Sequence, residues 1–492
     1  MQVVWGYKNR KPVLDHIGSA HNAHDLAVLK ARAQRLIDSG QTQLELGLDG
    51  VGAAGGTGSE HNPVPITAER AGLLLDAIAG SFHHLGLDQA TGGDRVFYDL
   101  VAARVIHPGS KFDSMETLAE VGVQSVSYAT IKRHLPTYAT ESYRTPITQA
   151  LARYSGIGPG VLVLYDVTTL YFETEAPDDL RQPGFSKERR LEPQITVGML
   201  TDAAGLPLAI GAFEGNKAET QTMLPMIQRL QDAYQLDTVT IVADAGMLSA
   251  ANKTAVLNAG LHYILGVKDT RIPQVIAQWR ADHPDTDYKD GQIWSTDSYA
   301  DARSPMASAT RTYYQYSHDR ARRSLRGIKE QVAKAERAVA GDIPVKRNRY
   351  VDLKAPHKKV NYALAEKHTA MAGIKGYETS RTDLTAEQVI GAYRQLFRIE
   401  KSFRMAKSDL KARPVYARLE DSIQAHLTIV MCAMAVGHVL EQTSGLSLKR
   451  LVRTLKKYRS FTINVAGQTI HAQTPIPTEI KHIIDKLPKM SY

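Results

Sequence analysis

Two stretches near the middle of the chain consist mostly of β-branched and other apolar residues, and each ends on one aspartate. Residues 161–165 precede Asp166, and residues 238–243 precede Asp244. Apolar runs of this length that are rich in Val and Ile predict buried strands. Because an ionised carboxylate among apolar side chains is disfavoured unless it is paired or coordinates a metal, the two strands indicate a divalent cation shared by the aspartates.

The segment around these two strands alternates between strand and helix patterns. The further predicted elements are strands at 194–200, 207–213 and 262–267, a turn at 202–205, and helices at about 220–234 and 250–259. A strand, a hairpin, a helix, a strand, a helix and a strand in this order predict a mixed α/β sheet.

The segment before the sheet, residues 66–143, has a helical pattern. Within it, Ser114–Val121 and Ser127–Leu135 are two short predicted helices separated by a turn that contains glycine. A helix-turn-helix has this spacing, and its second helix would present Lys132 and Arg133 to DNA. Short helix pairs with a glycine turn also occur in plain helical bundles.

The two ends of the chain carry weaker patterns. Near the N-terminus we expect a short strand, a polar helix at about 23–39 and a flexible glycine-rich linker at 47–59. The linker contains a G-x-G-x-x-G pattern, but further glycines and two prolines rather than a helix follow it, which favours a linker over a nucleotide-binding loop. Towards the C-terminus we predict an apolar helix at 423–440, a basic helix at 446–458 and a hairpin at 461–470.

Regular alternation stops between residues 268 and 383. The piece from Asp319 to Arg349 holds ten Lys and Arg residues against four acids. A charge run is usually a solvated helix face, and a surface that faces DNA is the alternative. We interpret this segment as an insertion domain with a basic surface.

Composition limits the class of protein. A chain of 492 residues suggests roughly three domains of the usual size. The net charge of +9 is a modest indication of a polyanionic partner. The single cysteine, Cys432, cannot form an intramolecular disulfide and is expected to be a small core residue. With no secretory signal and no apolar run of the roughly 18 residues that span a bilayer, we expect a cytoplasmic protein without membrane contact.

These patterns divide the chain into six parts. They are an N-terminal strand, helix and linker at 1–65; a helical DNA-binding region at 66–155 with the possible helix-turn-helix at 114–135; a first core part at 156–268; the basic insertion at 269–383; a second core part at 384–440; and a C-terminal extension of helix and hairpin at 441–492.

A helix predicted at 392–408 carries a third acidic candidate, Glu400. Tyr393, Glu400 and Lys407 are seven residues apart each time, which places them on one helix face about 10.5 Å from one another. Polar tips at this spacing suit contact with an extended phosphate backbone. An amphipathic helix with a core stripe of Leu396, Phe397 and Phe403 would show the same spacing by chance.

The blocks Tyr165-Asp166-Val-Thr-Thr and Ala243-Asp244-Ala-Gly-Met247, together with Tyr393, Glu400 and Lys407, resemble the D-D-E transposases of bacterial insertion sequences. The similarity is to the large group marked by the Y-(2)-R-(3)-E-(6)-K signature, with insertion sequence four as its namesake. Flanking motifs, Gly18-Ser-Ala-His-Asn22, Gly184-Phe-Ser-Lys187 and Glu214-Gly-Asn216, resemble a long-chained branch of that group.

The resemblance implies an RNase H-like mixed-sheet core, in which the strands of Asp166 and Asp244 are parallel neighbours and Glu400 arrives from a helix packed across them. Glu400 lies 156 residues after Asp244, which leaves room for the insertion domain expected in this group. Hard oxygen ligands suit Mg²⁺ or Mn²⁺, and two ions per site would support in-line phosphodiester chemistry without a protein nucleophile. The signature's arginine falls on Leu396 here, so its phosphate contact would be absent or moved to Arg394 or Arg398.

The resemblance also implies partners and further site residues. The expected partners are double-stranded DNA, both transposon ends and target, and a second copy of the chain as a homodimer in the DNA complex, in a bacterial cytoplasm at the nucleoid. The expected DNA-binding residues are Tyr393, Arg398, Arg404, Lys407, Lys132, Arg133, and, in the basic loop at 184–190, Lys187, Arg189 and Arg190.

The leading hypothesis is therefore a transposase that binds terminal inverted repeats, cleaves the ends and joins 3′-OH ends to target DNA. A stand-alone nuclease of the same fold is one alternative, and a catalytically inactive DNA-binding protein derived from a transposase is another. The presence of all three carboxylates favours an active enzyme, since drift would be expected to remove at least one of them.

Overall fold

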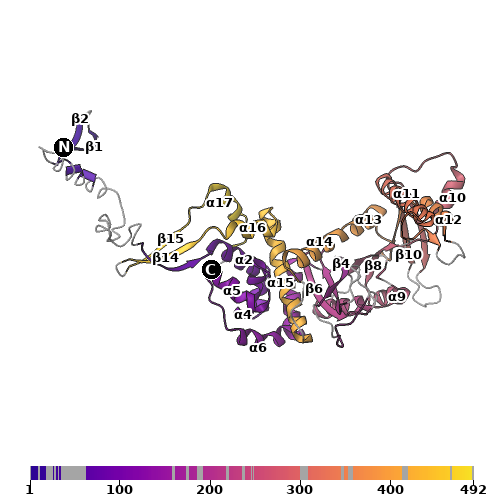
Figure 1. The fold of residues 1–492 in the computed structure, drawn as a ribbon, viewed down its shortest axis with the longest axis horizontal. Coiled ribbons are helices and arrows are strands. Elements are labelled where there is room, and N and C mark those ends of the chain that lie inside the picture. The colour runs from indigo at the N-terminus through magenta and orange to yellow at the C-terminus, as the bar shows by residue number, and fades with distance from the viewer. Residues whose placement is uncertain are drawn as a thin grey trace. The chain divides into compact units, whose positions relative to one another are not determined.

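A mixed sheet of eight strands, in the order β6-β5-β4-β7-β8-β13-β10-β9, is the largest sheet that the computed structural model describes (Figure 1). The strands β4, β7 and β8 are mutually parallel, and every other neighbouring pair is antiparallel. The strands are β4 (Leu162–Tyr171), β5 (Gln194–Thr201), β6 (Pro207–Glu214), β7 (Thr240–Ala243), β8 (His262–Val267), β9 (Ile293–Tyr299), β10 (Ala309–Tyr316) and β13 (Ile374–Thr379).

The structure describes residues 2–8, 11–17, a few single positions from 26 to 34, 63–157, 161–172, 177–184, 192–217, 221–234, 239–244, 246–247, 249–299, 309–344, 348–352, 358–412, 419–465 and 468–489. The predicted linker at 47–59 and most of the predicted helix at 23–39 lie outside these ranges. So do Lys187, Arg189 and Arg190.

The sheet fits the RNase H-like core that the sequence predicts. An antiparallel meander of β4, β5 and β6 is followed by β7 and β8, which pair parallel on the other side of β4. The helices α8 (Met223–Tyr234) and α9 (Ala250–Asn258) connect these strands. All of these elements lie where the sequence pattern predicts them, because the periods of two and of 3.6 residues are local signals.

The segment at 269–383 adds strands to the same sheet. β13 pairs with β8, β10 with β13, and β9 with β10, so the sheet runs on without interruption. The helices of this segment are α10 (Gln274–Asp282), α11 (His318–Ala340) and α12 (Tyr362–Ala370), and a two-stranded sheet is formed by β11 (Val351–Asp352) and β12 (Lys359–Val360). Two small hydrophobic clusters, around Trp294 and around Tyr350, form the interior of this segment.

Helices α2 to α7 precede the sheet along the chain, and α16 and α17 follow the long helix α15 (Glu420–Ser444). Their bounds are α2 (Gly72–His84), α3 (Leu87–Ala90), α4 (Arg95–Ile106), α5 (Lys111–Glu120), α6 (Tyr128–Ala139) and α7 (Glu141–Tyr154), then α16 (Leu448–Leu455) and α17 (Thr478–Ile484). α5 and α6 are the two helices predicted around the glycine turn, and Ser110 and Ser127 cap their N-termini.

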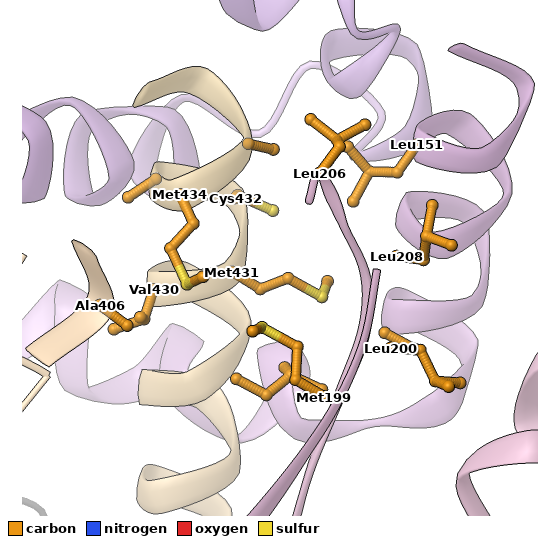
Figure 2. Packing of buried hydrophobic residues seen from close by; sticks show 14 of the residues in the cluster. Leu151, Met199, Leu200, Leu206, Leu208, Ala406, Val430, Met431, Cys432 and Met434 are labelled. Carbon is orange, nitrogen blue, oxygen red and sulfur yellow. The ribbon is translucent and has the colours of Figure 1, made fainter. Parts of the chain in front are cut away.

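Helix α15 (Glu420–Ser444) joins the helical region to the sheet. It packs against α2, α4 and α6 as well as against β6. Figure 2 shows Met431 of α15 pointing towards Met199 of the β5–β6 hairpin, with Cys432 buried nearby. α15 is long and apolar enough to cross a membrane, and thus longer than the apolar run in the sequence indicates, but most of that stretch is buried inside the structure. A helix that is hydrophobic on all sides is typical of such a central core position.

Residues 1–69 with 460–474 form a smaller unit, separate from the unit of residues 70–459 and 475–492. It contains the hairpin of β1 (Gln2–Lys8) and β2 (Lys11–His16) and a sheet in the order β15-β14-β3, in which β3 (Ile66–Arg70) is a strand where the sequence predicts the start of the helical region. The C-terminal hairpin predicted at 461–470 is confirmed by β14 (Ser460–Val465) and β15 (Gln468–Gln473). Its predicted turn at residues 466–467 lies outside the described residues.

Candidate active site

The register of two parallel strands brings Asp166 and Asp244 to the same level of the sheet. β4 pairs with β7 through Leu162 and Thr240 up to Leu164 and Val242, and each aspartate lies two residues beyond that last pair. Neighbouring strands are about 4.8 Å apart, so the two carboxylates belong to adjacent positions. The prediction that these strands are parallel neighbours is confirmed.

The surroundings of the two aspartates differ. Asp166 still lies within β4, is half-buried and accepts a hydrogen bond from the backbone N–H of Val167 at 2.8 Å. Asp244 follows the end of β7 and is exposed. The Asp244 Oδ1 atom accepts a hydrogen bond from the Tyr393 hydroxyl at 2.6 Å. A carboxylate at the end of a short strand can thus face solvent, whereas Asp166 cannot move without the strand.

Tyr393 packs against the sheet and is held by a lysine of one of its strands. Its side chain is only 9% exposed, and its hydroxyl accepts a hydrogen bond from the ammonium group of Lys375 on β13 at 3.0 Å. The ammonium also lies 4.5 Å from the centre of the tyrosine ring. A side chain at Gly266 of β8 would place its Cβ 2.5 Å from the hydroxyl oxygen, so the missing side chain makes room for the tyrosine.

Burial and charge shift the pKa values of this group in opposite directions. Burial raises the pKa of the Tyr393 hydroxyl above its ordinary value, and the hydrogen bond and charge of Asp244 add to this, as does the charge of Glu400. Burial lowers the pKa of Lys375, while the charge of Asp244 opposes that shift. The tyrosine is therefore a neutral hydroxyl that donates its proton to Asp244.

Glu400 lies on a helix that is shorter than the sequence predicts. The single helix expected at 392–408 is divided into α13 (Ala386–Arg394), α14 (Leu396–Arg404) and a π-helical turn, η2 (Met405–Asp409). The division coincides with a local 3₁₀ hydrogen-bond pattern, in which the N–H of Gln395 and that of Arg398 each donate to the carbonyl three residues earlier. Tyr393, Glu400 and Lys407 consequently belong to three successive elements rather than to one regular helix face.

Helix α14 packs against β4 and is fixed to the turn of the β5–β6 hairpin. The Arg398 guanidinium donates to the carbonyl of Ala203 at 2.7 Å, and the Ser402 hydroxyl donates to that of Gly205 at 2.6 Å. Gly205 has a φ of +94°, which favours glycine at this turn. Exposed Glu400 is thereby carried on a helix that the core strands position.

The donor set suits a hard divalent cation only in part. Asp166 and Asp244 supply carboxylate oxygens, which Mg²⁺ and Mn²⁺ prefer. Within the described residues, however, no three His, Cys, Asp or Glu side chains are gathered closely enough to hold a metal ion. Two carboxylates on neighbouring strands are therefore in place, and Glu400 is not gathered with them.

The other residues expected to contact DNA have varied surroundings. Arg404 is exposed, whereas Lys407 is half-buried in η2. Leu396, at the position of the signature's arginine, packs against the main core, and the Arg394 guanidinium donates to the side-chain oxygen of Gln315 at 3.0 Å. Lys132 and Arg133 are exposed on α6, in the predicted helix pair.

Lys375 and Gly266 are the site residues that the sequence patterns did not identify. Both contact Tyr393 only because β8 and β13 are neighbours in the sheet, although 109 residues of chain separate the two positions. A glycine inside a strand is a sequence signal for close approach by another group, and Gly266 carries that signal. Lys375 carries none, since it lies in an otherwise ordinary strand.

Comparisons with known proteins identify the family of the chain. The family model described as a transposase DDE domain matches residues 158–436, which contain Asp166, Asp244 and Glu400. Among solved structures, the chain is similar to piggyBac transposase in a synaptic complex with hairpin DNA, at 11% sequence identity, a TM-score of 0.38 and coverage of 79% of each chain. None of the curated proteins compared with the chain is significantly similar to it. Because the family model covers more than half of its residues, the chain belongs to the DDE transposase family.

Proposed function

We propose that this protein is a transposase that binds the terminal inverted repeats of its own insertion sequence, hydrolyses the DNA at the ends and joins the 3′-OH ends to target DNA. One observation carries the proposal, namely the parallel register that sets Asp166 beside Asp244 inside the matched family domain. A pair of carboxylates on neighbouring parallel strands suits metal-dependent phosphodiester chemistry.

Within this proposal, Asp166, Asp244 and Glu400 are the residues that would hold divalent ions. DDE transposases generally use such ions, which activate water or a 3′-OH and stabilise the leaving oxygen. Asp166 offers a carboxylate fixed by its strand, Asp244 offers one oriented by Tyr393, and Glu400 offers an exposed one on α14. The chain's own contribution is to orient these oxygens and to hold the phosphate backbone, and no protein nucleophile takes part.

The proposal includes the DNA contacts and the branch of the family. Lys132 and Arg133 on α6 contact the transposon ends, and Arg404 and Lys407 contact the backbone beside Glu400, with two copies of the chain in the DNA complex. The tyrosine, glutamate and lysine of the Y-(2)-R-(3)-E-(6)-K signature support membership of the insertion-sequence-four-like group, despite Leu396.

End cleavage by the purified full-length protein tests the proposal. The substrate is linear DNA carrying the inverted repeats that flank its own gene, with Mg²⁺ or Mn²⁺ present. We expect Asp166→Ala, Asp244→Ala and Glu400→Ala each to reduce cleavage by more than the roughly 10- to 100-fold that loss of an outer-shell metal partner costs.

A matched control removes a carboxylate elsewhere in the same sheet. Asp297 on β9 is exposed and paired with Arg311, so Asp297→Ala should cleave like the wild type. Cleavage that survives loss of any of the three proposed ligands would contradict the site assignment, and a wild type that binds the ends but never cleaves them would contradict the enzymatic function.

A further inference from the structure

Lys375 has unused hydrogen-bonding capacity close to Asp244. An ammonium group has three N–H donors. In the described residues, the Lys375 ammonium makes one hydrogen bond, to the Tyr393 hydroxyl at 3.0 Å. That hydroxyl donates directly to Asp244. Lys375 is therefore linked through a single side chain, Tyr393, to a candidate metal ligand, and it keeps two N–H donors. A half-buried ammonium in this position can therefore donate to an anionic acceptor as well.

Tyr393 itself has no donor to offer. A phenol carries one proton, and the proton of Tyr393 is donated to Asp244 at 2.6 Å. The oxygen of the same hydroxyl accepts from Lys375. Phosphate oxygens of DNA only accept hydrogen bonds, so Tyr393 cannot bind one while it holds Asp244. The side chain is also nearly buried, at 9% exposure.

Further positive charge lies next to Lys375. Gln315 of β10 is directly opposite Lys375 of β13, and its side-chain oxygen accepts from the exposed Arg394. The charge of Arg320 on α11 is close enough to lower the pKa of Lys375. Cations from α11, α13 and β13 therefore converge at the edge of the sheet where Asp244 lies, and a polyanionic strand beside the carboxylates would be attracted there.

We propose that Lys375 binds a non-bridging oxygen of a DNA phosphate adjacent to the Asp166–Asp244 pair, while Tyr393 positions Asp244 and does not contact the phosphate. The inference rests on the proposed function, since it requires DNA at this site. It assigns the phosphate contact to a strand of the segment at 269–383, whereas the resemblance assigns it to the tyrosine of the signature.

The salt dependence of DNA binding separates the two assignments. Each phosphate contact releases counterions, so removing one lowers the slope of log affinity against log salt by about 1, equally for all DNA sequences. With Ca²⁺ at saturating concentration, Lys375→Met should lower the slope by about 1 on both end DNA and unrelated DNA. Tyr393→Phe should leave the slope unchanged, and Lys375→Arg should restore it.

Lys253 provides a matched control for the loss of charge. Its ammonium pairs with Glu378 at 2.6 Å and lies 5.8 Å from the centre of the Tyr263 ring, so it is another partly buried lysine beside a carboxylate and a tyrosine. Lys253→Met should bind DNA with the slope of the wild type. Thermal unfolding of each variant shows whether it is folded, and Lys375→Gln replaces Lys375→Met if the latter is not.

The possible outcomes are distinct. An unchanged slope in Lys375→Met, or an equal loss of slope in Tyr393→Phe, overturns the inference and leaves the proposed function intact if the wild type cleaves. A wild type that binds DNA without cleaving contradicts the proposed function, while the slopes still decide the role of Lys375. A wild type that binds no DNA overturns both.

Discussion

At the scale of single residues, the candidate site depends on a contact that a methyl group would disrupt. A Cβ at Gly266 would lie 2.5 Å from the Tyr393 hydroxyl oxygen and 3.0 Å from the ring carbon that bears it. We expect Gly266→Ala to displace the tyrosine, break its bond to Asp244 and lower the free energy of unfolding by about 1–3 kcal/mol, as overpacking does. Urea denaturation measures this change.

Two further variants identify the cause of that loss. Gly327 lies inside α11 with open space around it, so Gly327→Ala should stabilise the protein by up to about 1 kcal/mol through helix propensity alone. In a Tyr393→Phe background, Gly266→Ala should cost less, because the closest clashing atom is gone. An equal cost in both backgrounds would show that the hydroxyl does not fill this space.

A lysine outside the candidate site gives the unfolding free energy a pH dependence. Burial, aided by the charge of Arg104, lowers the pKa of Lys111 to about 7, and its ammonium lies 3.3 Å from Nδ1 of the buried His426. In the unfolded chain a lysine keeps its proton up to about pH 10.4. Between these pH values the unfolded state binds more protons, so the stability due to this group rises with pH.

We therefore expect the wild type to gain unfolding free energy from pH 7 to pH 9, and Lys111→Met to gain less over the same interval. Urea denaturation at pH 7, 8 and 9 measures both slopes. Lys329→Met, at an exposed position of α11, should keep the slope of the wild type. Equal slopes in Lys111→Met and the wild type would show that Lys111 is not the titrating group.

The sequence alone predicted some residues of the candidate site and missed others. Asp166 and Asp244 were predictable because the apolar runs before them are local signals, and their pairing followed once the strands were parallel neighbours. The contact of Lys375 with Tyr393 was not, since it requires β13 to lie next to β8 and Gly266 to leave space. Long-range register of this kind depends on which strands pair, and no local pattern contains that information.

At the scale of elements, patterns predicted where helices and strands occur better than how they join. The strands β5, β6 and β8 and the helix α9 lie within a residue or two of their predicted ranges. The helix at 392–408 was predicted as one piece, because polar residues seven apart suit one straight helix as well as they suit the divided helix of the structure. Anchoring of α14 to the β5–β6 turn through Arg398 and Ser402, and the π-helical turn after it, are tertiary features. π-helical turns are often found at functional sites, and the one described here contains Lys407, for which we propose a DNA contact.

At the scale of the whole larger unit, one hydrophobic core joins the helical region to the sheet. The same cluster contains Phe97 of α4, Ile241 of β7 and Met431 of α15. The segment at 269–383 is coupled to this core through the strand pairs β8–β13 and β13–β10. A destabilising substitution in one of the helices before the sheet should therefore also destabilise the far end of the sheet.

Phe97 and two tryptophans make this coupling measurable. Phe97 is fully buried against Tyr138 and Tyr143, so Phe97→Ala should lower the free energy of unfolding by about 3–5 kcal/mol. Trp279 and Trp294 lie on α10 and β9, and in a Trp5→Phe background their fluorescence reports on that segment alone. We expect Phe97→Ala to lower the urea midpoint of this fluorescence together with that of far-UV circular dichroism. Phe112→Ala, at a residue 63% exposed, should change the free energy of unfolding by no more than about 0.5 kcal/mol and leave both midpoints close to those of the parent protein. A fluorescence midpoint that stays at the value of the parent protein while the circular dichroism transition moves would show that the segment at 269–383 unfolds independently of the helical region.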